Sequence, residues 1–308
     1  LAGSTSDIDL IVVSPARLQD ASRISTMAFA QGSRLGIKHY GHEEVVQSMA
    51  YLADLSDRTA GEVWQGVTSW RAPAPLVDIE RLINGLRDDG VSPLAHGLEH
   101  LCGVRFSYSF GLFREAIIHG CLAQRASETR APWGYLLHAL PHLMDVVLSC
   151  EGDVVTNIKW TTQRWGQSDA ARTEEWRLID DWWSRAWNGL RAKGAPPKPD
   201  DFLTLYEQAK SALGLSLGED REPLSWRDDL QTAPFGEGVE LTRDGAGRIV
   251  LHEVADLRRD YALEELCRLE QSTARGVLAF VRANFAHARL RQSQLAGHGK
   301  ALFRGHAR

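Results

Sequence analysis

The sequence contains few cysteines, and they are widely spaced. Only four of the 308 residues are cysteines, at positions 102, 121, 150 and 267, and no two of them form a C-x-x-C pair. Disulfide frameworks and cysteine-based zinc sites usually need closer spacing, so we interpret these residues as small buried thiols in a reducing compartment, the cytoplasm. An apolar run of about eighteen residues is also missing, so we expect no membrane span.

An excess of basic charge is lacking as well. The formal net charge is -5, with 44% hydrophobic and 24% charged residues. Proteins dedicated to nucleic acids neutralise phosphates with a basic surface, so the acidic balance argues against a nucleic-acid partner. The apolar fraction is too high for a disordered chain, and the length is sufficient for a sizeable core.

The apolar pattern changes along the chain, which predicts several structural parts. Strand and helix patterns alternate in residues 1–75. We expect strands over 8–13, 35–40 and 61–67, and helices over 15–31 and 42–55. Long helical patterns follow from 76 onward, including one over 173–191 that carries Trp176, Trp183 and Trp187 on one face. Further on, we expect a helix near 200–213, a hairpin over 239–252 and a helix over 256–292.

These elements predict an α+β fold of three parts. We expect a small mixed sheet with helices over 1–75, a helical domain over 76–193 and a C-terminal helical and hairpin module over 200–308. The boundaries rest on two proline-rich connectors, at residues 72–75 and 194–199.

The strongest chemical motif lies at the start of the first predicted strand. In Ser6-Asp7-Ile8-Asp9-Leu10 the two aspartates stand at positions i and i+2, so both belong to one face of the strand. Two adjacent carboxylates repel each other unless a cation lies between them. Mg²⁺ suits such a pair, because it prefers carboxylate and phosphate oxygens. The motif therefore predicts a magnesium site for a phosphorylated substrate.

This motif resembles the acid-hydrophobic-acid-hydrophobic element of the nucleotidyltransferase superfamily, which includes DNA polymerase β, the aminoglycoside and lincosamide nucleotidyltransferases and the MNT antitoxins. The resemblance implies a nucleotidyltransferase-type mixed sheet, a two-metal Mg²⁺ site and ATP or another nucleoside triphosphate as co-substrate. Asp7 and Asp9 would be the catalytic metal ligands, and Ser6 would cap the start of the strand beside the nucleotide. The Gly-Ser turn of the family stands about a dozen residues earlier, so we expect it upstream of Leu1.

The resemblance also implies a third carboxylate, and Asp78 in Val77-Asp78-Ile79-Glu80 is our candidate for this catalytic and metal-binding role. The alternative is that Asp78 and Glu80 are acids of a first helical turn, where the helix dipole favours them. Glu62 is a weaker rival for the same role.

A lysine that reaches the triphosphate from the helical domain is a further implication of the resemblance. Lys159, next to Trp160, is the candidate, because the chain has only six lysines and this one has apolar neighbours. Its alternative is an ordinary surface lysine, and Arg164 is the second candidate for contact with the nucleotide.

The expected activity is the transfer of a nucleoside monophosphate, most readily AMP, to a hydroxyl group of a small molecule such as a natural product or antibiotic. The partners are then a nucleoside triphosphate and a small-molecule acceptor, with a homodimer as an option. Two alternatives remain open at this point. One is an MNT-type protein AMPylase, and the other is an inactive relative that only binds nucleotide or a partner.

Overall fold

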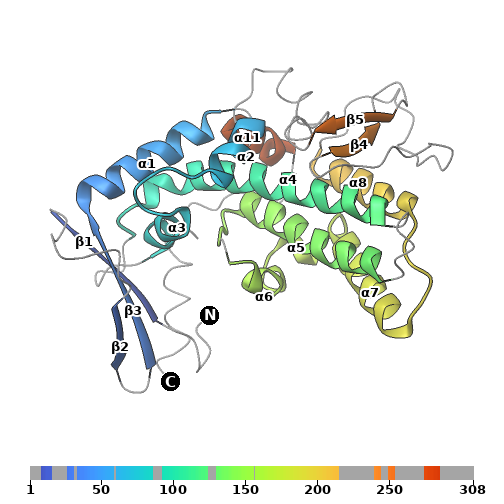
Figure 1. Ribbon diagram of the computed structural model, residues 1–308, viewed down its shortest axis with the longest axis horizontal. Helices are drawn as coiled ribbons and strands as arrows, with labels where there is room; N and C mark the ends of the chain where they lie inside the picture. Colours follow the sequence, from blue (N-terminus) through green and yellow to red (C-terminus); the bar gives the residue numbers. More distant parts are fainter. Residues whose placement is uncertain are drawn as a thin grey trace. The chain divides into compact units, whose positions relative to one another are not determined.

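The computed structural model describes residues 8–15, 26–30, 33–58, 60–85, 92–123, 130–155, 157–214, 239–243, 249–253 and 274–284. These residues are mostly helical and include two small sheets, which agrees with an α+β fold (Figure 1). The chain divides into two compact units. The described residues within 1–55 and 66–101 form the first, here called the sheet unit. Those within 56–65 and 102–289 form the second, the helical unit.

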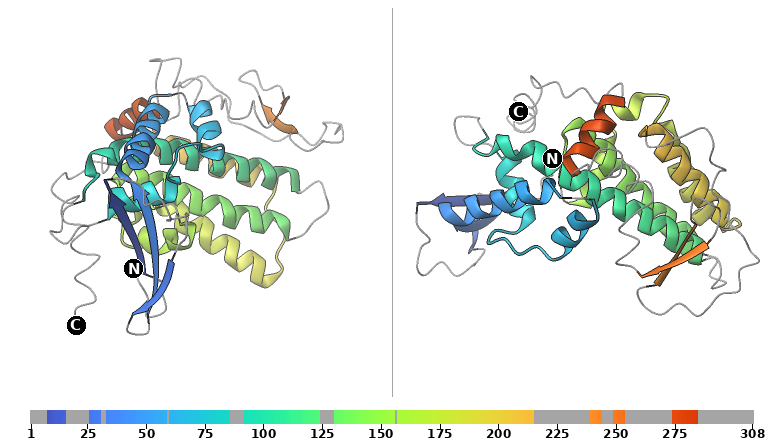
Figure 2. Two further views of the ribbon diagram at one scale, coloured as in Figure 1. Left: turned by 60° about the vertical axis from the view of Figure 1, so that its left-hand side comes forward. Right: turned by 90° about the horizontal axis from the view of Figure 1, so that it is seen from above.

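Three strands form the sheet of the sheet unit, with β3 (Ser33–Gly41) between β1 (Ile8–Ser14) and β2 (Thr26–Ala30). β1 runs parallel to β3 and β2 antiparallel to it (Figures 1 and 2). The strands predicted over 8–13 and 35–40 are confirmed. The helix predicted over 15–31 is wrong at its end, because residues 26–30 pair with β3, and sheet pairing overrides their helical propensity. Residues 16–25 lie outside the described part.

Helix α1 (His42–Ser56) follows β3 without a loop. The backbone N–H of Gly41 donates to Oε2 of Glu44 at 2.9 Å, so a side chain three residues into the helix satisfies an amide at its start. Val45, Leu52 and Leu55 are buried, at the spacing of one helical face. The helix predicted over 42–55 is confirmed.

The prediction of a strand over 61–67 is wrong, because this segment is part of helix α2 (Ala60–Thr68). Its β-branched valines suggested a strand. However, Val63 and Trp64 are both buried and Val67 lies four residues after Val63, a spacing that suits a helix.

Helix α3 (Leu76–Asn84) starts directly after Pro75, whose extended backbone ends the proline-rich connector. The hydroxyl of Ser48 on α1 accepts a hydrogen bond from the Ala74 N–H at 2.9 Å and donates to the Glu44 carbonyl. This buried hydroxyl fixes the start of α3 against α1. α3 is followed by the short helix η1 (Ala95–Gly97).

The helical unit is built around α5 (Ala131–Glu151), in which every residue from Ala139 to Cys150 except Pro141 is buried. α5 lies between α4 (Leu98–Ala123), in which the boundary between the units falls, and α7 (Arg177–Ala192) (Figures 1 and 2). The unit also includes η3 (Ile158–Trp160), α6 (Thr161–Trp165), η4 (Ala170–Arg172), α8 (Pro199–Ala212), β4 (Val239–Arg243), β5 (Ile249–Glu253) and α11 (Ala274–Asn284).

The hairpin predicted over 239–252 is confirmed, since β4 and β5 pair antiparallel. The helix predicted near 200–213 is confirmed as α8. Of the helix predicted over 256–292, only residues 274–284 are described, and these are helical. The face predicted for the helix over 173–191 is partly wrong: Trp176 is buried, but Trp187 is 38% exposed and Trp182 takes its place inside.

Aromatic rings and close-packed glycines join the helices of this unit. Phe110 and Phe113 of α4 lie 6.2 and 6.1 Å from the ring of Tyr206 on α8. Gly120 of α4 lies against the ring of Phe202, so closely that an added Cβ would stand 2.2 Å from a ring carbon. None of the helices in the described ranges has the length and apolar run that a membrane span requires.

Gly120→Ala tests this contact between α4 and α8. Alanine has the higher helix propensity, but its Cβ would meet the fully buried ring of Phe202, so we expect destabilisation by about 1–3 kcal/mol. Gly134→Ala on α5 is the matched control, because its added Cβ meets no atom of the described residues within 4 Å outside the adjoining backbone of its own helix. That variant should gain about 0.5–1 kcal/mol. Urea unfolding of the two variants measures both values, and equal stabilisation would show that the contact is absent.

Candidate functional site

The motif that carries the chemical prediction lies at the start of β1. Asp9 is the second residue of the strand and is aligned with Gly36 of β3, while Ile11 is aligned with Lys38. Aligned residues of neighbouring strands share a face and alternate residues repeat it, so position 9 belongs to the same sheet face as position 38. Ser6 and Asp7 lie outside the described residues, and for Asp9 the structure describes the strand position alone.

A buried ion-pair cluster lies on that face of the sheet. Lys38 donates to both carboxylate oxygens of Asp78, at 2.7 and 2.9 Å. The hydroxyl of Tyr40 donates to Asp78 Oδ2 at 2.5 Å, and Arg81 donates to Oδ1 at 3.2 Å. Asp78 itself has no solvent exposure. A buried carboxylate is stable only with such partners, and here it has four donor contacts.

Local sequence explains how the cluster forms. Lys38 and Tyr40 stand two residues apart in β3, so both side chains leave the same face of the sheet. Asp78 is in the first turn of α3, where the helix dipole stabilises an acid. The first-turn position of Asp78 therefore agrees with the alternative given for it from the sequence. A metal could bind Asp78 only if its donors moved away, and the metal-ligand role stays a prediction. Glu62, its weaker rival, is exposed on α2.

Sequence reasoning missed Lys38 as a site residue. The available indication was a lysine inside an apolar strand, in a chain with only six lysines. A lysine at an interior strand position needs a partner when it is partly buried. The partner lies 40 residues further along the chain, so the pairing was not visible in the local pattern.

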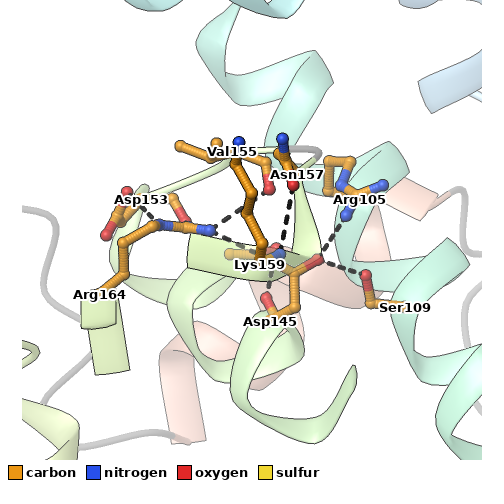
Figure 3. Close-up of polar contacts among 9 residues, drawn as sticks. Arg105, Ser109, Asp145, Asp153, Val155, Asn157, Lys159 and Arg164 are labelled. Carbon is orange, nitrogen blue, oxygen red and sulfur yellow. Dashed lines mark hydrogen bonds and ion pairs between the residues drawn. The ribbon is translucent and has the colours of Figure 1, made fainter. Parts of the chain in front are cut away.

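The helical unit has its own buried polar cluster, centred on Asp145 of α5 (Figure 3). Arg105 and Ser109, one helical turn apart on α4, each donate to Asp145 Oδ2 at 2.6 Å. Arg164 of α6 approaches from the opposite side and donates to Oδ1 at 3.5 Å. All four side chains are buried. The cluster joins three helices through a single carboxylate.

Arg164 and Lys159, the two residues of this unit predicted to contact the nucleotide, lie in different environments: Arg164 is buried and Lys159 is exposed. The guanidinium group of Arg164 donates to Asp145, to the side chain and carbonyl of Asp153, and to the carbonyl of Val155. Its side chain is 2% exposed, so these internal contacts occupy it. Lys159 in η3 is exposed, and its Nζ lies 4.9 Å from the centre of the Trp160 ring.

Burial in the same unit shifts two ionisable groups. Burial, and then the charge of His138, lowers the pKa of His142 from 6.5 to about 4, so this imidazole is neutral at pH 7. Its Nε2 and the Nε of Arg105 have no hydrogen-bond partner among the described residues. Burial raises the pKa of the Cys150 thiol, which makes it a poor nucleophile.

Within the described ranges, no three His, Cys, Asp or Glu side chains gather closely enough to hold a metal ion. The buried cluster at Asp145 is a self-neutralising network of ion pairs, which suits a structural role. The sheet face that carries position 9, Lys38 and Asp78 combines acidic and basic groups next to the strand with the Asp-x-Asp motif. It is therefore the candidate site.

Comparison with known proteins gives a family and no activity. A protein-family profile described as "Family of unknown function (DUF6001)" matches residues 1–183. This is more than half of the chain, so the chain belongs to that family. No curated protein and no solved structure matches the sequence.

Asp145→Ala tests the structural role of the cluster in the helical unit. The substitution leaves the buried guanidinium groups of Arg105 and Arg164 without their shared carboxylate, so we expect a loss of about 3–5 kcal/mol of stability. Asp181→Ala, at an exposed position of α7, is the control and should change stability by less than about 1 kcal/mol. Chemical unfolding followed by circular dichroism gives both values. Similar small effects in the two variants would contradict the role assigned to Asp145.

His142 makes stability depend on pH. In the unfolded chain it binds a proton below about pH 6.5, whereas in the folded protein it stays neutral down to about pH 4. Stability is therefore lost as the pH falls between these values, by up to about 3 kcal/mol. Burial raises the pKa of Glu151, which acts in the opposite direction, so the comparison must be made against a variant.

The matched variant is His142→Gln, which removes the titration and keeps a polar side chain. Unfolding free energies at pH 7 and pH 4.5 should differ less in this variant than in the wild-type protein. The same pH dependence in both proteins would show that His142 is not responsible.

Proposed function

We propose that this DUF6001 member is a magnesium-dependent nucleotidyltransferase that modifies a small molecule. The observation that carries the proposal is the position of the Asp-x-Asp motif: Asp9 lies in β1, the strand that pairs in parallel with β3 within a small mixed sheet. A helical unit accompanies this sheet, as expected from the resemblance to small-molecule nucleotidyltransferases.

The donor set suits Mg²⁺. Asp7 and Asp9 supply two carboxylates at alternate positions of one chain segment, and a hard cation prefers oxygen ligands of this kind. When bound, Mg²⁺ would neutralise the triphosphate and polarise the phosphorus under attack. The task of the chain itself is to hold the triphosphate beside these carboxylates in one orientation.

The reaction would be a single displacement at phosphorus. An oxygen of the acceptor hydroxyl forms a bond to the α-phosphorus of ATP, and the bond from that phosphorus to the bridging oxygen of the β-phosphate breaks. Pyrophosphate leaves with the electron pair, and the hydroxyl proton passes to solvent or a nearby base. Such reactions depend mainly on positioning and charge neutralisation, so the sheet face would hold the triphosphate in place while the metal would neutralise its charge.

A second candidate function is nucleotide binding without turnover. The observation that favours it is the environment of Asp78, whose two oxygens receive donors from Lys38, Tyr40 and Arg81. If Asp78 keeps these partners, Asp7 and Asp9 are the sole carboxylates of the motif left for the metal. Binding of Mg²⁺ and ATP without release of pyrophosphate would distinguish this function from catalysis.

The double variant Asp7→Asn, Asp9→Asn tests the site of both functions. Calorimetry of the wild-type protein with Mg²⁺ and ATP should give saturable binding. The double variant should bind at least about tenfold more weakly, a loss of about 1.4 kcal/mol, because the metal loses both carboxylates. The control is Asp181→Asn on the exposed side of α7, which should bind as the wild-type protein does.

Two results would contradict the proposal. One is a wild-type protein that binds none of the four common nucleoside triphosphates in the presence of Mg²⁺. The other is unchanged binding in a folded double variant, since the motif would then have no part in the site.

A further inference from the structure

We propose that Lys38 of β3 is the lysine that binds the phosphate oxygens of the nucleoside triphosphate, and that buried Asp78 is its positioning residue. This inference rests on the proposed function and assigns a residue to the nucleotide that the sequence motif did not indicate. It also gives Asp78 a role other than that of a metal ligand.

Among the described residues, the ammonium group of Lys38 has partners for two of its three donors. A lysine carries three N–H donors, and two of them point at the oxygens of Asp78, at 2.7 and 2.9 Å. The part of the chain that the structure describes offers no acceptor to the third. The side chain of Lys38 is 29% exposed while that of Asp78 is 1% exposed, so the carboxylate lies inside and the ammonium group reaches solvent.

The location of Lys38 suits a triphosphate bound at the Asp-x-Asp motif. Position 9 is aligned with Gly36, so Lys38 lies two strand positions further along the neighbouring strand and on the same face. Diagonal neighbours on adjacent strands stand about 7–8 Å apart. A phosphate chain bound at the carboxylates would bring one of its oxygens within reach of the ammonium group.

Two basic side chains meet at Asp78, and both reach solvent. Lys38 and Arg81 are paired with its carboxylate, and their side chains are 29% and 36% exposed. A phosphate oxygen that accepts from Lys38 would form a charge-assisted hydrogen bond, which is stronger than a neutral one.

Lys38 is held in place by a partner, whereas Lys159, the lysine predicted from the sequence, is not paired with a carboxylate among the described residues. Asp78 and the strand hold the ammonium group of Lys38 in one place before any ligand arrives. Lys159 is exposed and lies over the ring of Trp160, and in the described residues no carboxylate pairs with its ammonium group. A preorganised donor loses less conformational entropy when a ligand binds, so Lys38 is the better phosphate ligand.

Three lysine variants decide between these residues: Lys38→Met, Lys159→Met and Lys193→Met. Lys193 is exposed at the end of α7 and is the matched control. With Mg²⁺ and ATP in calorimetry, we expect Lys38→Met to weaken binding about tenfold to a hundredfold and Lys193→Met to leave it unchanged. A fluorescent adenosine without phosphates should bind equally to all variants. A loss in Lys159→Met with wild-type affinity in Lys38→Met would overturn the assignment.

Asp78→Asn tests the positioning role. If Asp78 orients Lys38, the variant should bind ATP more weakly, while the Mg²⁺ concentration that gives half-maximal binding stays the same. If Asp78 were a metal ligand, the required Mg²⁺ concentration would rise, and the positioning role would be wrong. Asp181→Asn, at an exposed position of α7, is the control and should bind ATP as the wild-type protein does.

The wild-type protein provides a test that does not depend on folding of a variant. Lys38 should react more slowly with a methylating reagent for amines when Mg²⁺ and ATP are present, as measured by peptide mass spectrometry. Lys193 provides the internal reference. Equal reaction rates of Lys38 with and without the nucleotide, at saturating ATP, would overturn its assignment.

These experiments separate the two proposals. Absence of triphosphate binding in the wild-type protein would end both. Binding that is lost in the Asp7→Asn, Asp9→Asn variant but retained in Lys38→Met would leave the proposed function in place and remove Lys38 from it.

Discussion

The arrangement of the sheet unit depends on the hydrogen bonds and ion pairs of one buried carboxylate, that of Asp78. It lies fully buried in the first turn of α3 and receives donors from two residues of β3 and one of its own helix. A buried charge without partners is very unfavourable, so these contacts fix the position of α3 on the sheet face. They also fix the ammonium group of Lys38 on the face that carries position 9. The same interaction therefore holds the fold together and arranges the candidate site.

The helical unit uses the same kind of interaction for a different purpose. Asp145 also receives two basic partners and a hydroxyl, but all of these side chains are buried and belong to three different helices. At the end of α5, Arg282 of α11 donates to the carbonyls of Ser149 and Cys150, which a helix end leaves without internal partners. The Asp145 cluster joins helices that follow one another along the chain, whereas Arg282 stands 132 residues after Cys150. We interpret both sets of contacts as structural.

Local patterns in the sequence were sufficient for most elements of this fold. The helix over 42–55 and the hairpin over 239–252 follow from residue spacing and turn residues, and both are confirmed. The strand predicted over 61–67 was wrong because valine favours strands, while burial of Val63 and Trp64 on a helix determined the outcome. The end of the helix predicted over 15–31 was wrong for the opposite reason, since pairing with β3 draws residues 26–30 into the sheet.

The candidate site was harder to predict from the sequence than the fold. Asp7 and Asp9 stand out because their spacing is local. The pairing of Lys38 with Asp78 joins residues 40 positions apart, and no local pattern reveals it. For the same reason the sequence could not distinguish a third metal ligand from a buried ion pair at Asp78. Lys159 was selected for its neighbour Trp160, but sequence alone does not show whether an ammonium group is held in place.

The most direct test of the account is a crystal structure of the protein with Mn²⁺ and a non-hydrolysable ATP analogue, because Mn²⁺ can be located by its anomalous scattering. The account predicts an ion at coordination distance from the carboxylate of Asp9 and a phosphate oxygen within hydrogen-bonding distance of Lys38 Nζ. An ion and nucleotide bound elsewhere, with the sheet face at Asp9 empty, would contradict it.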